Sequence, residues 1–141
     1  MNTVFFLRGT QSAGKSTVAE TIRSLANRSN THAVVCCADD YFTDTTTGEY
    51  KFNGSKLGAA HKECQDKYRY ALEGRAEIVI VANTNADSRS IDYYQSLAES
   101  HNYLFFSLIV ERRHDNKNHH NVPESAILAT AEKIVATLKL F

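Results

Sequence analysis

Short apolar runs alternate along the chain with stretches in which apolar residues recur every three or four positions. The apolar runs cover about residues 3–7, 33–38, 77–82 and 103–110. Each is rich in β-branched or aromatic side chains and almost continuous in apolarity, which is typical of parallel strands buried on both faces. This alternation predicts a mostly parallel, four-stranded sheet covered by helices.

Helical periodicity follows each of these runs. The stripes that predict the four helices are Val18, Ile22, Leu25 and Ala26, then Leu57, His61, Cys64, Tyr68 and Leu72, then Ile91, Tyr94, Leu97 and Ala98, and last Ile127, Leu128, Ala131, Ile134, Val135 and Leu138. Gly74 would end the second helix, and Pro123 would open the fourth near its first turn. We expect these stripes to face the core, with His61 and Cys64 packing there or anchoring a loop.

Two segments have no periodicity and are candidate functional loops. Residues 39–55 are rich in Thr, Asp and Gly, and residues 111–122 hold a run of charged, His and Asn side chains. We predict a substrate loop at about 39–55 and a lid at about 111–122, both within one domain that spans residues 1–141. The expected fold class is a three-layer α/β/α sandwich.

The composition limits the classes of function. The 141 residues are 43% hydrophobic and 23% charged, as in an ordinary globular domain. Lys plus Arg and Asp plus Glu both number 16, so nucleic-acid binding would need a local basic patch. The odd number of cysteines, two of them in an apolar run, favours a reduced, cytoplasmic protein. No run approaches membrane-spanning length, so no membrane partner is expected.

One motif carries the strongest functional signal. Residues 9–16 match G-x-x-x-x-G-K-[ST], the P-loop or Walker A pattern, between a predicted strand and a predicted helix. There, backbone N–H groups and the helix N-terminus bind phosphate oxygens, while Lys15 would reach the β- and γ-phosphates and Ser16 would ligate Mg²⁺. We predict ATP and Mg²⁺ as cofactors, with GTP left open. The predicted nucleotide-binding residues are Gly9, Thr10, Gln11, Ser12, Ala13, Gly14, Lys15, Ser16 and Thr17.

A second candidate site follows the second predicted strand. Asp39 and Asp40 stand at the carboxyl end of the sheet, where ligands bind in open α/β folds. One carboxylate could accept the proton of an attacking hydroxyl while the other orients the loop or holds a metal-bound water. The alternative is that both aspartates only cap a turn.

The order and spacing of several blocks add a family resemblance. These are "RGTQSAGKST", "ADDYF" at 38–42, "GEYKF" from Gly48, "LGAAHKEC" at 57–64, "IVIVANTN" at 78–85 and "NHHNVP" at 118–123. Together they resemble the small P-loop kinases, including AAA-type ATP-binding proteins, related to the phage polynucleotide 5′-hydroxyl kinase. The resemblance implies a P-loop NTPase of the kinase type with strand order 2-3-1-4, and a kinase acting on single-stranded nucleic acid or a nucleotide.

The resemblance also implies roles for individual residues. Asp39 would be the general base, and Lys15 with the lid residues Arg112, Arg113 and Lys117 would stabilise the transferring phosphoryl group. The implied substrate-binding residues are Asp40, Phe42, Asn83, Thr84 and Asn85.

Three departures leave alternatives open. Relatives carry an acid at one of the positions of Ala82 and Asn83, an acceptor-binding arginine at Phe42, and an arginine at Lys117. An aromatic ring at residue 42 could instead stack on a base. The alternatives are a kinase for a small metabolite or modified base, and a non-catalytic ATP-binding module. The spacing of His114, His119 and His120 fits no common zinc pattern, so no structural zinc is expected.

Overall fold

The computed structural model describes residues 1–115 and 121–141. Within these residues the strands are β1 (Thr3–Arg8), β2 (Ala33–Cys36), β3 (Ile78–Ala82) and β4 (Leu104–Ile109). The α-helices are α1 (Lys15–Arg28), α2 (Leu57–Glu73), α3 (Ser88–Ser100) and α4 (Glu124–Ala136). Two short 3-10 helices, η1 (Ala38–Phe42) and η2 (Gly54–Lys56), lie in the predicted substrate loop. The substrate loop therefore has local structure that periodicity could not predict.

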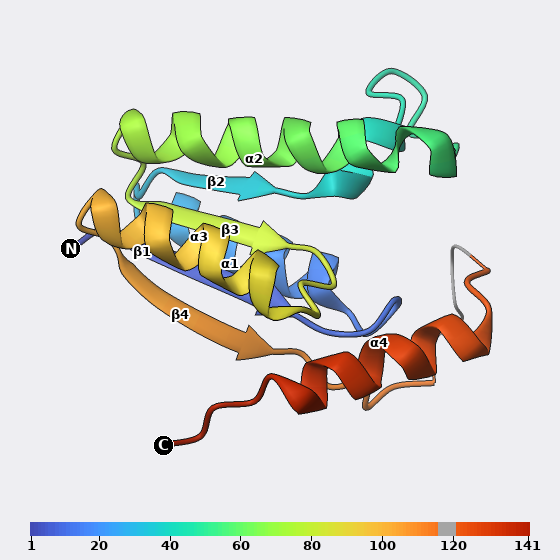
Figure 1. The fold of residues 1–141 in the computed structure, drawn as a ribbon. Coiled ribbons are helices and arrows are strands. Elements are labelled where there is room, and N and C mark those ends of the chain that lie inside the picture. The colour runs from blue at the N-terminus through green and yellow to red at the C-terminus, as the bar shows by residue number, and fades with distance from the viewer. Residues whose placement is uncertain (116–120) are drawn as a thin grey trace.

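The strands form one parallel sheet in the order β2-β3-β1-β4 (Figure 1). Central β1 pairs with β3 on one side and β4 on the other, so that Leu7 lies opposite Ala82 and Leu108. The predicted order and the α/β/α class are confirmed. Because all strands run the same way, the loops that follow them meet at one edge of the sheet.

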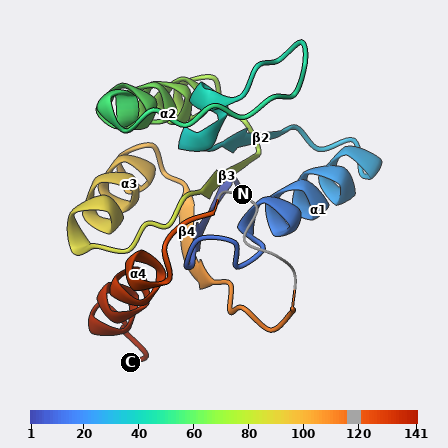
Figure 2. The same ribbon diagram turned by 90° about the vertical axis from the view of Figure 1, so that its right-hand side faces the viewer.

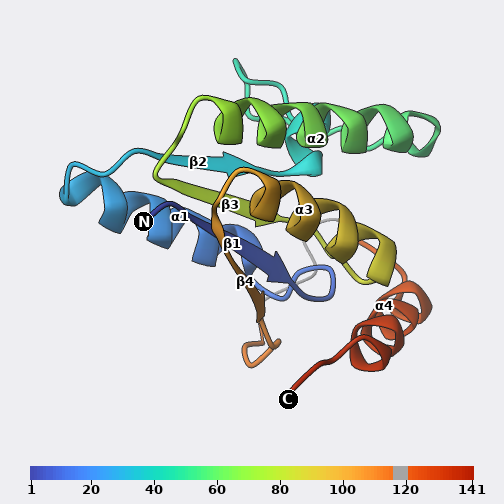
Figure 3. The ribbon, with the colours of Figure 1, turned by 60° about the vertical axis from the view of Figure 1, so that its left-hand side comes forward.

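Helices cover both faces of the sheet. Figure 2 shows α2, α3 and α4 on one side and α1 on the other. The larger core joins β1, β2 and β3 to α2 and α3, with Phe6, Tyr68 and Tyr94 among its buried rings. The smaller core joins Leu7 and Ile80 to α1. Helix α4 lies near the N-terminal end of α3, on the side of the strands' carboxyl ends (Figure 3).

Strand β4 differs from the prediction of strands buried on both faces. Helix α1 contacts β1, β2 and β3, and Phe106 of β4 stacks on Phe5 at 6.2 Å between ring centroids. Leu104, Phe106 and Leu108 remain 40%, 46% and 40% exposed. The expectation was wrong for β4 because an apolar run does not tell whether a helix reaches that edge of the sheet.

Some predicted core positions are also exposed. Leu25, Leu57 and His61 lie at the surface, and in α4 only Ile134 of the predicted stripe is buried, while Leu128, Val135 and Leu138 are exposed. The helices exist as predicted, but their buried faces are narrower than the apolar stripes. In the described part of the chain, no helix is both long and apolar enough to cross a bilayer.

Candidate functional site

The loop between β1 and α1 has the backbone geometry of an anion site. Ser12 and Gly14 adopt positive φ angles of 63° and 110°, and the Ala13 N–H donates to the Thr10 carbonyl at 3.2 Å. Helix α1 begins at Lys15 with Gly14 as its N-cap, which has no side chain to cap the first N–H groups. These N–H groups and the helix dipole therefore favour an anionic ligand at this position.

Gly9 is required by close packing rather than by a positive φ. A Cβ atom at this position would lie 2.8 Å from the Val110 carbonyl oxygen, which is closer than real Cβ contacts come. The Gly9 N–H donates to the Thr84 carbonyl at 3.3 Å. The first glycine of the motif thus lets the P-loop pack against the segments that follow β3 and β4.

Lys15 lies across the P-loop. Its Nζ donates to the Gly9 carbonyl at 2.9 Å and to the Thr10 carbonyl at 2.7 Å. Burial lowers the pKa of Lys15 to about 8, and the nearby Asp39 carboxylate acts in the opposite direction. The lysine that would bind phosphate and the carboxylate predicted as general base therefore lie within electrostatic reach of each other.

A groove of about 480 Å³ lies beside the P-loop, between α1, β2 and α2. Ser16, Asp40 and Lys67 are among its lining residues. The Ser16 hydroxyl from α1 and the Asp40 carboxylate from η1 are hard oxygen ligands of the kind that Mg²⁺ prefers. Ser16 and Asp40 thus fit a metal bound with a nucleotide.

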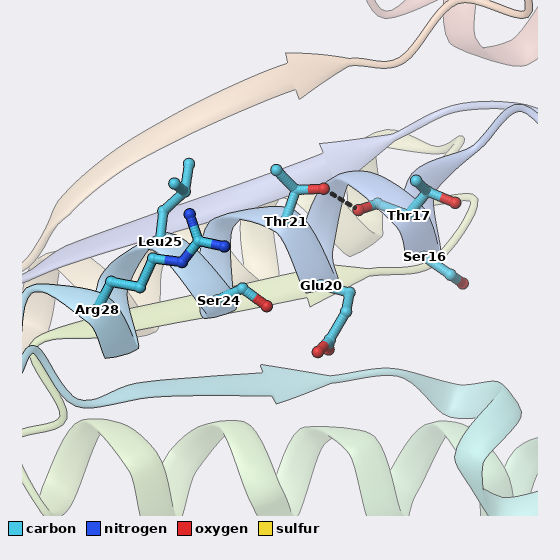
Figure 4. Close-up of a pocket in the computed structure, with 7 residues that line it drawn as sticks. All are labelled: Ser16, Thr17, Glu20, Thr21, Ser24, Leu25 and Arg28. Carbon is cyan, nitrogen blue, oxygen red and sulfur yellow. Dashed lines mark hydrogen bonds between the residues drawn. The ribbon is translucent and has the colours of Figure 1, made fainter.

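A second hollow, of about 550 Å³, runs along the outer face of α1 (Figure 4). Ser16 and Thr17 lie at one end of it and Arg28 at the other, and the Thr21 hydroxyl donates to the Thr17 carbonyl at 2.8 Å. Among the predicted site residues only Ser16 and Thr17 line it. Leu25 lines this hollow, so its side chain faces solvent instead of the core.

The substrate loop begins with η1, which carries Asp39 and Asp40 directly after β2. The Ala38 N–H donates to the Asn83 side-chain oxygen at 2.8 Å, which fixes the start of η1 to the end of β3. Beyond η1, Thr43 and Tyr50 form an antiparallel bridge. The turn between them is closed by the Asp44 carboxylate, which accepts from the backbone N–H groups of residues 46 and 47.

This hairpin brings Tyr50 to the predicted base. The Tyr50 hydroxyl donates to the Asp39 carboxylate at 3.3 Å. Burial and the neighbouring Asp39 charge raise the pKa of Tyr50 to about 12, so its proton stays in place at neutral pH. Partial burial raises the pKa of Asp40, opposed by Lys67 and supported by Asp39 and Glu63. The two adjacent aspartates thus have different surroundings.

The predicted substrate-binding residues are mostly buried. Phe42 is 7% exposed and belongs to the larger core, so its faces are not open to a base. Asn83 is 8% exposed, and its amide N–H donates to the Cys64 sulfur at 3.5 Å. Asn85 is 4% exposed, has a positive φ of 48° and donates to the Leu7 carbonyl at 2.9 Å. Thr84 supports the P-loop through its carbonyl. A substrate-binding role for Asn83, Thr84 and Asn85 stays a prediction.

The described part of the lid contacts the P-loop through His114. His114 Nε2 lies 3.1 Å from the Ala13 carbonyl oxygen, where it donates if that nitrogen carries the proton. Arg113 pairs with Glu111, with Nε at 2.6 Å from the carboxylate. Arg112 is exposed. Lys117 lies outside the described residues, as do His119 and His120.

Sequence reasoning missed Tyr50, His114 and Arg8. The buried Arg8 donates to the Asn85 carbonyl at 2.8 Å and to the Thr137 hydroxyl, so it ties the P-loop strand to the end of α4. An arginine directly after an apolar strand run and before the glycine of the motif was a signal that could have found Arg8. Tyr50 and His114 gave no such signal, because the turns that position them are not periodic.

The three thiols do not form a reactive site. Cys36, Cys37 and Cys64 are free, and burial raises the pKa of each of these thiols. Within residues 1–115 and 121–141, no group of three or more His, Cys, Asp or Glu side chains could hold a metal ion.

Comparison with known proteins identifies the fold. No family model matches the chain. Human NEDD4-binding protein 2 is 33% identical over 97 residues, which are 69% of this chain but only 5% of that protein. The chain therefore spans a small part of this relative.

Solved structures share the overall fold of this chain. The APS kinase CysC of Mycobacterium tuberculosis, in complex with AMPPNP and APS, matches 78% of this chain and 62% of its own with a TM-score of 0.55 and 14% identity. The Pnkp1/Rnl/Hen1 complex matches 91% of this chain and 38% of its own with a TM-score of 0.57 and 18% identity. This chain therefore has the α/β fold of these solved structures.

Proposed function

We propose that this chain is an ATP-dependent kinase that transfers the γ-phosphoryl group to a hydroxyl acceptor, with a polynucleotide 5′-hydroxyl or a nucleotide as the preferred acceptor. The observation that carries the proposal is that Lys15 lies across the P-loop while η1 places Asp39 directly after β2. A cation that can hold the transferred phosphate and a carboxylate that can take a proton lie at the same edge of the sheet. In kinases, positive charge on the phosphates stabilises the transferring group and a carboxylate accepts the proton of the attacking hydroxyl, which attacks in line with the leaving oxygen.

Each residue has one task in this reaction. Lys15 and the N–H groups of the P-loop hold the phosphates, and Asp39 takes the proton of the acceptor hydroxyl. The acceptor oxygen bonds to the γ-phosphorus as the bond to the β–γ bridging oxygen breaks, which releases ADP. Mg²⁺ bound with ATP would neutralise phosphate charge, and Ser16 with Asp40 would hold it. Tyr50 positions Asp39 through its hydrogen bond.

The lid would complete the site by adding positive charge. Arg112 and Arg113 are exposed beside His114, which contacts the P-loop. Arg113 would exchange its surface pairing with Glu111 for a phosphate oxygen, because exposed ion pairs are weak. Lys117 would act in the same way from the rest of the lid.

Transfer of label from γ-labelled ATP with Mg²⁺ to a single-stranded 5′-hydroxyl oligonucleotide tests the proposal. We expect labelled product that disappears in the Lys15→Ala variant. A panel of nucleosides, nucleotides and adenosine 5′-phosphosulfate run beside it would reveal a smaller acceptor. Labelling of no acceptor in the panel, with ATP binding intact, would reject the kinase and favour a non-catalytic ATP-binding module.

One observation favours the non-catalytic alternative. Ala82 at the end of β3 is 4% exposed and Asn83 is engaged in structural hydrogen bonds, so β3 brings no acid to the phosphates. Asp40 is the acid that would take this place. An Asp40→Asn variant that keeps full activity at limiting Mg²⁺ would show that Asp40 does not help to hold the metal.

A further inference from the structure

The substrate loop exposes aromatic rings beside the predicted base. Tyr41 follows Asp40 directly and is 38% exposed, and Phe52 is 58% exposed. The ring centroids of Tyr41 and Phe52 lie 5.2 Å and 5.1 Å from that of the buried Phe42, both in edge-on geometry. We call Tyr41 and Phe52, supported by Phe42, the aromatic pad.

Backbone hydrogen bonds and side-chain contacts fix the position of the aromatic pad. Beyond the hairpin, the Lys51 N–H donates to the Phe42 carbonyl at 2.9 Å, which fixes the chain just before Phe52. The Phe52 ring also lies against Gly54, since a Cβ atom there would meet Phe52 Cε1 at 3.7 Å. The buried Phe42 ring packs edge-on against both Tyr41 and Phe52. An exposed Phe ring in a fixed position can stack on a planar, apolar group.

The pad shares its support with the reacting centre. Tyr50, whose hydroxyl donates to Asp39, has its ring centroid 6.3 Å from that of Phe42. An acceptor whose hydroxyl meets Asp39 would therefore extend its next group over the same cluster of rings. Lys51, which pairs with Glu49 at 3.7 Å, and Lys56 are exposed on either side of Phe52.

We propose that the aromatic pad stacks a nucleobase of the acceptor, so that Tyr41 and Phe52, instead of the buried Phe42, select a base-bearing substrate. This inference rests on the proposed kinase function and names its acceptor class. Stacking suits single-stranded nucleic acid because every base offers a flat face. The two lysines would lie along the phosphate backbone.

The chain contains no tryptophan, so a single introduced indole reports on the pad without background. In Phe52→Trp, a single-stranded DNA hexamer with a 5′-hydroxyl should quench the fluorescence saturably. The same hexamer without its 5′-terminal base should bind several-fold more weakly. Tyr70→Trp is the matched control, since Tyr70 is 66% exposed but lies near the opposite end of α2 from the substrate loop. Its fluorescence should not change. Equal quenching in both variants, or none in Phe52→Trp, would overturn the proposal.

Kinetics provide the second readout. Phe52→Ala should raise KM for the intact hexamer roughly 5- to 100-fold and leave KM for ATP unchanged. Phe52→Leu keeps apolar bulk but no flat ring, so it should behave like Phe52→Ala. Against the abasic hexamer, the unsubstituted protein and Phe52→Ala should be equal. Unchanged KM for the intact hexamer would refute the pad while leaving the kinase intact. Quenching in Phe52→Trp without phosphoryl transfer would refute the kinase while leaving the pad intact.

Discussion

The P-loop and the substrate loop both follow strands at the same edge of the sheet, yet they are built differently. The P-loop makes its site from backbone groups, with two positive φ angles and an uncapped helix N-terminus. The substrate loop makes its site from side chains that a hairpin and the buried Phe42 bring together. A backbone site has a fixed residue pattern, whereas a side-chain site depends on packing. The comparison separates what binds the donor from what selects the acceptor.

Apart from the loss of Asp39, the largest expected effect is on the donor side. Lys15→Ala removes the cation that would hold the transferred phosphate, and we expect transfer to fall about 10²–10³-fold. Initial rates with labelled ATP measure this effect. Lys139→Ala, an exposed lysine beyond the end of α4, is the control and should change the rate of transfer little. Equal losses of transfer rate in the two variants would mean that the rate depends on net positive charge and not on the position of Lys15.

Packing around the P-loop gives the next effect. Gly9→Ala places a Cβ atom 2.8 Å from the Val110 carbonyl oxygen, and overpacking of this kind costs about 1–3 kcal/mol of unfolding free energy. Gly58→Ala is the matched control, because its Cβ atom would meet nothing within 4 Å inside α2. It should stabilise the fold by about 0.5–1 kcal/mol. Denaturant unfolding measures both, and a neutral Gly9→Ala would contradict the packing.

The pH dependence of ATP binding tests the state of Lys15. Its pKa is lowered to about 8, so the charge is present below pH 8 and lost as pH rises through that value. Phosphates bind the charged form, and the apparent Kd for ATP should therefore rise about tenfold between pH 7 and pH 9. Calorimetric titration measures it, and Lys15→Arg should lose this dependence because arginine stays charged. An unchanged Kd across this range would show that Lys15 does not titrate there.

The smallest effect belongs to the substrate loop. Tyr50→Phe removes one hydrogen bond to Asp39, which is worth about 0.5–1.5 kcal/mol, so kcat should fall about 2- to 10-fold. KM for ATP should stay the same, since Tyr50 acts on Asp39 and not on the donor. Tyr93→Phe, on the outside of α3, is the control. A change in KM for ATP with unchanged kcat would place Tyr50 on the donor side.

The same contrast explains what the sequence could predict. The four strands and four helices follow from periodicity and the P-loop from a spaced motif, whereas the strand order came from the family resemblance. The exposed face of β4 could not be predicted, because apolar residues do not show whether a helix covers them. Tyr50 and Phe52 were missed because the turn that positions them rests on the Asp44 side chain and the bridge from Thr43. The burial of Phe42 likewise depends on neighbours distant in the sequence.

The most direct test of the central claim is to compare phosphoryl transfer and ATP affinity in Asp39→Asn. This substitution keeps the shape of the side chain and removes its ability to take a proton. We expect the single-turnover rate of transfer to the 5′-hydroxyl oligonucleotide to fall about 10²–10⁴-fold while the Kd for ATP changes little. A full rate in Asp39→Asn would contradict the assignment of Asp39 as the base, and with it the division into a donor loop and a substrate loop.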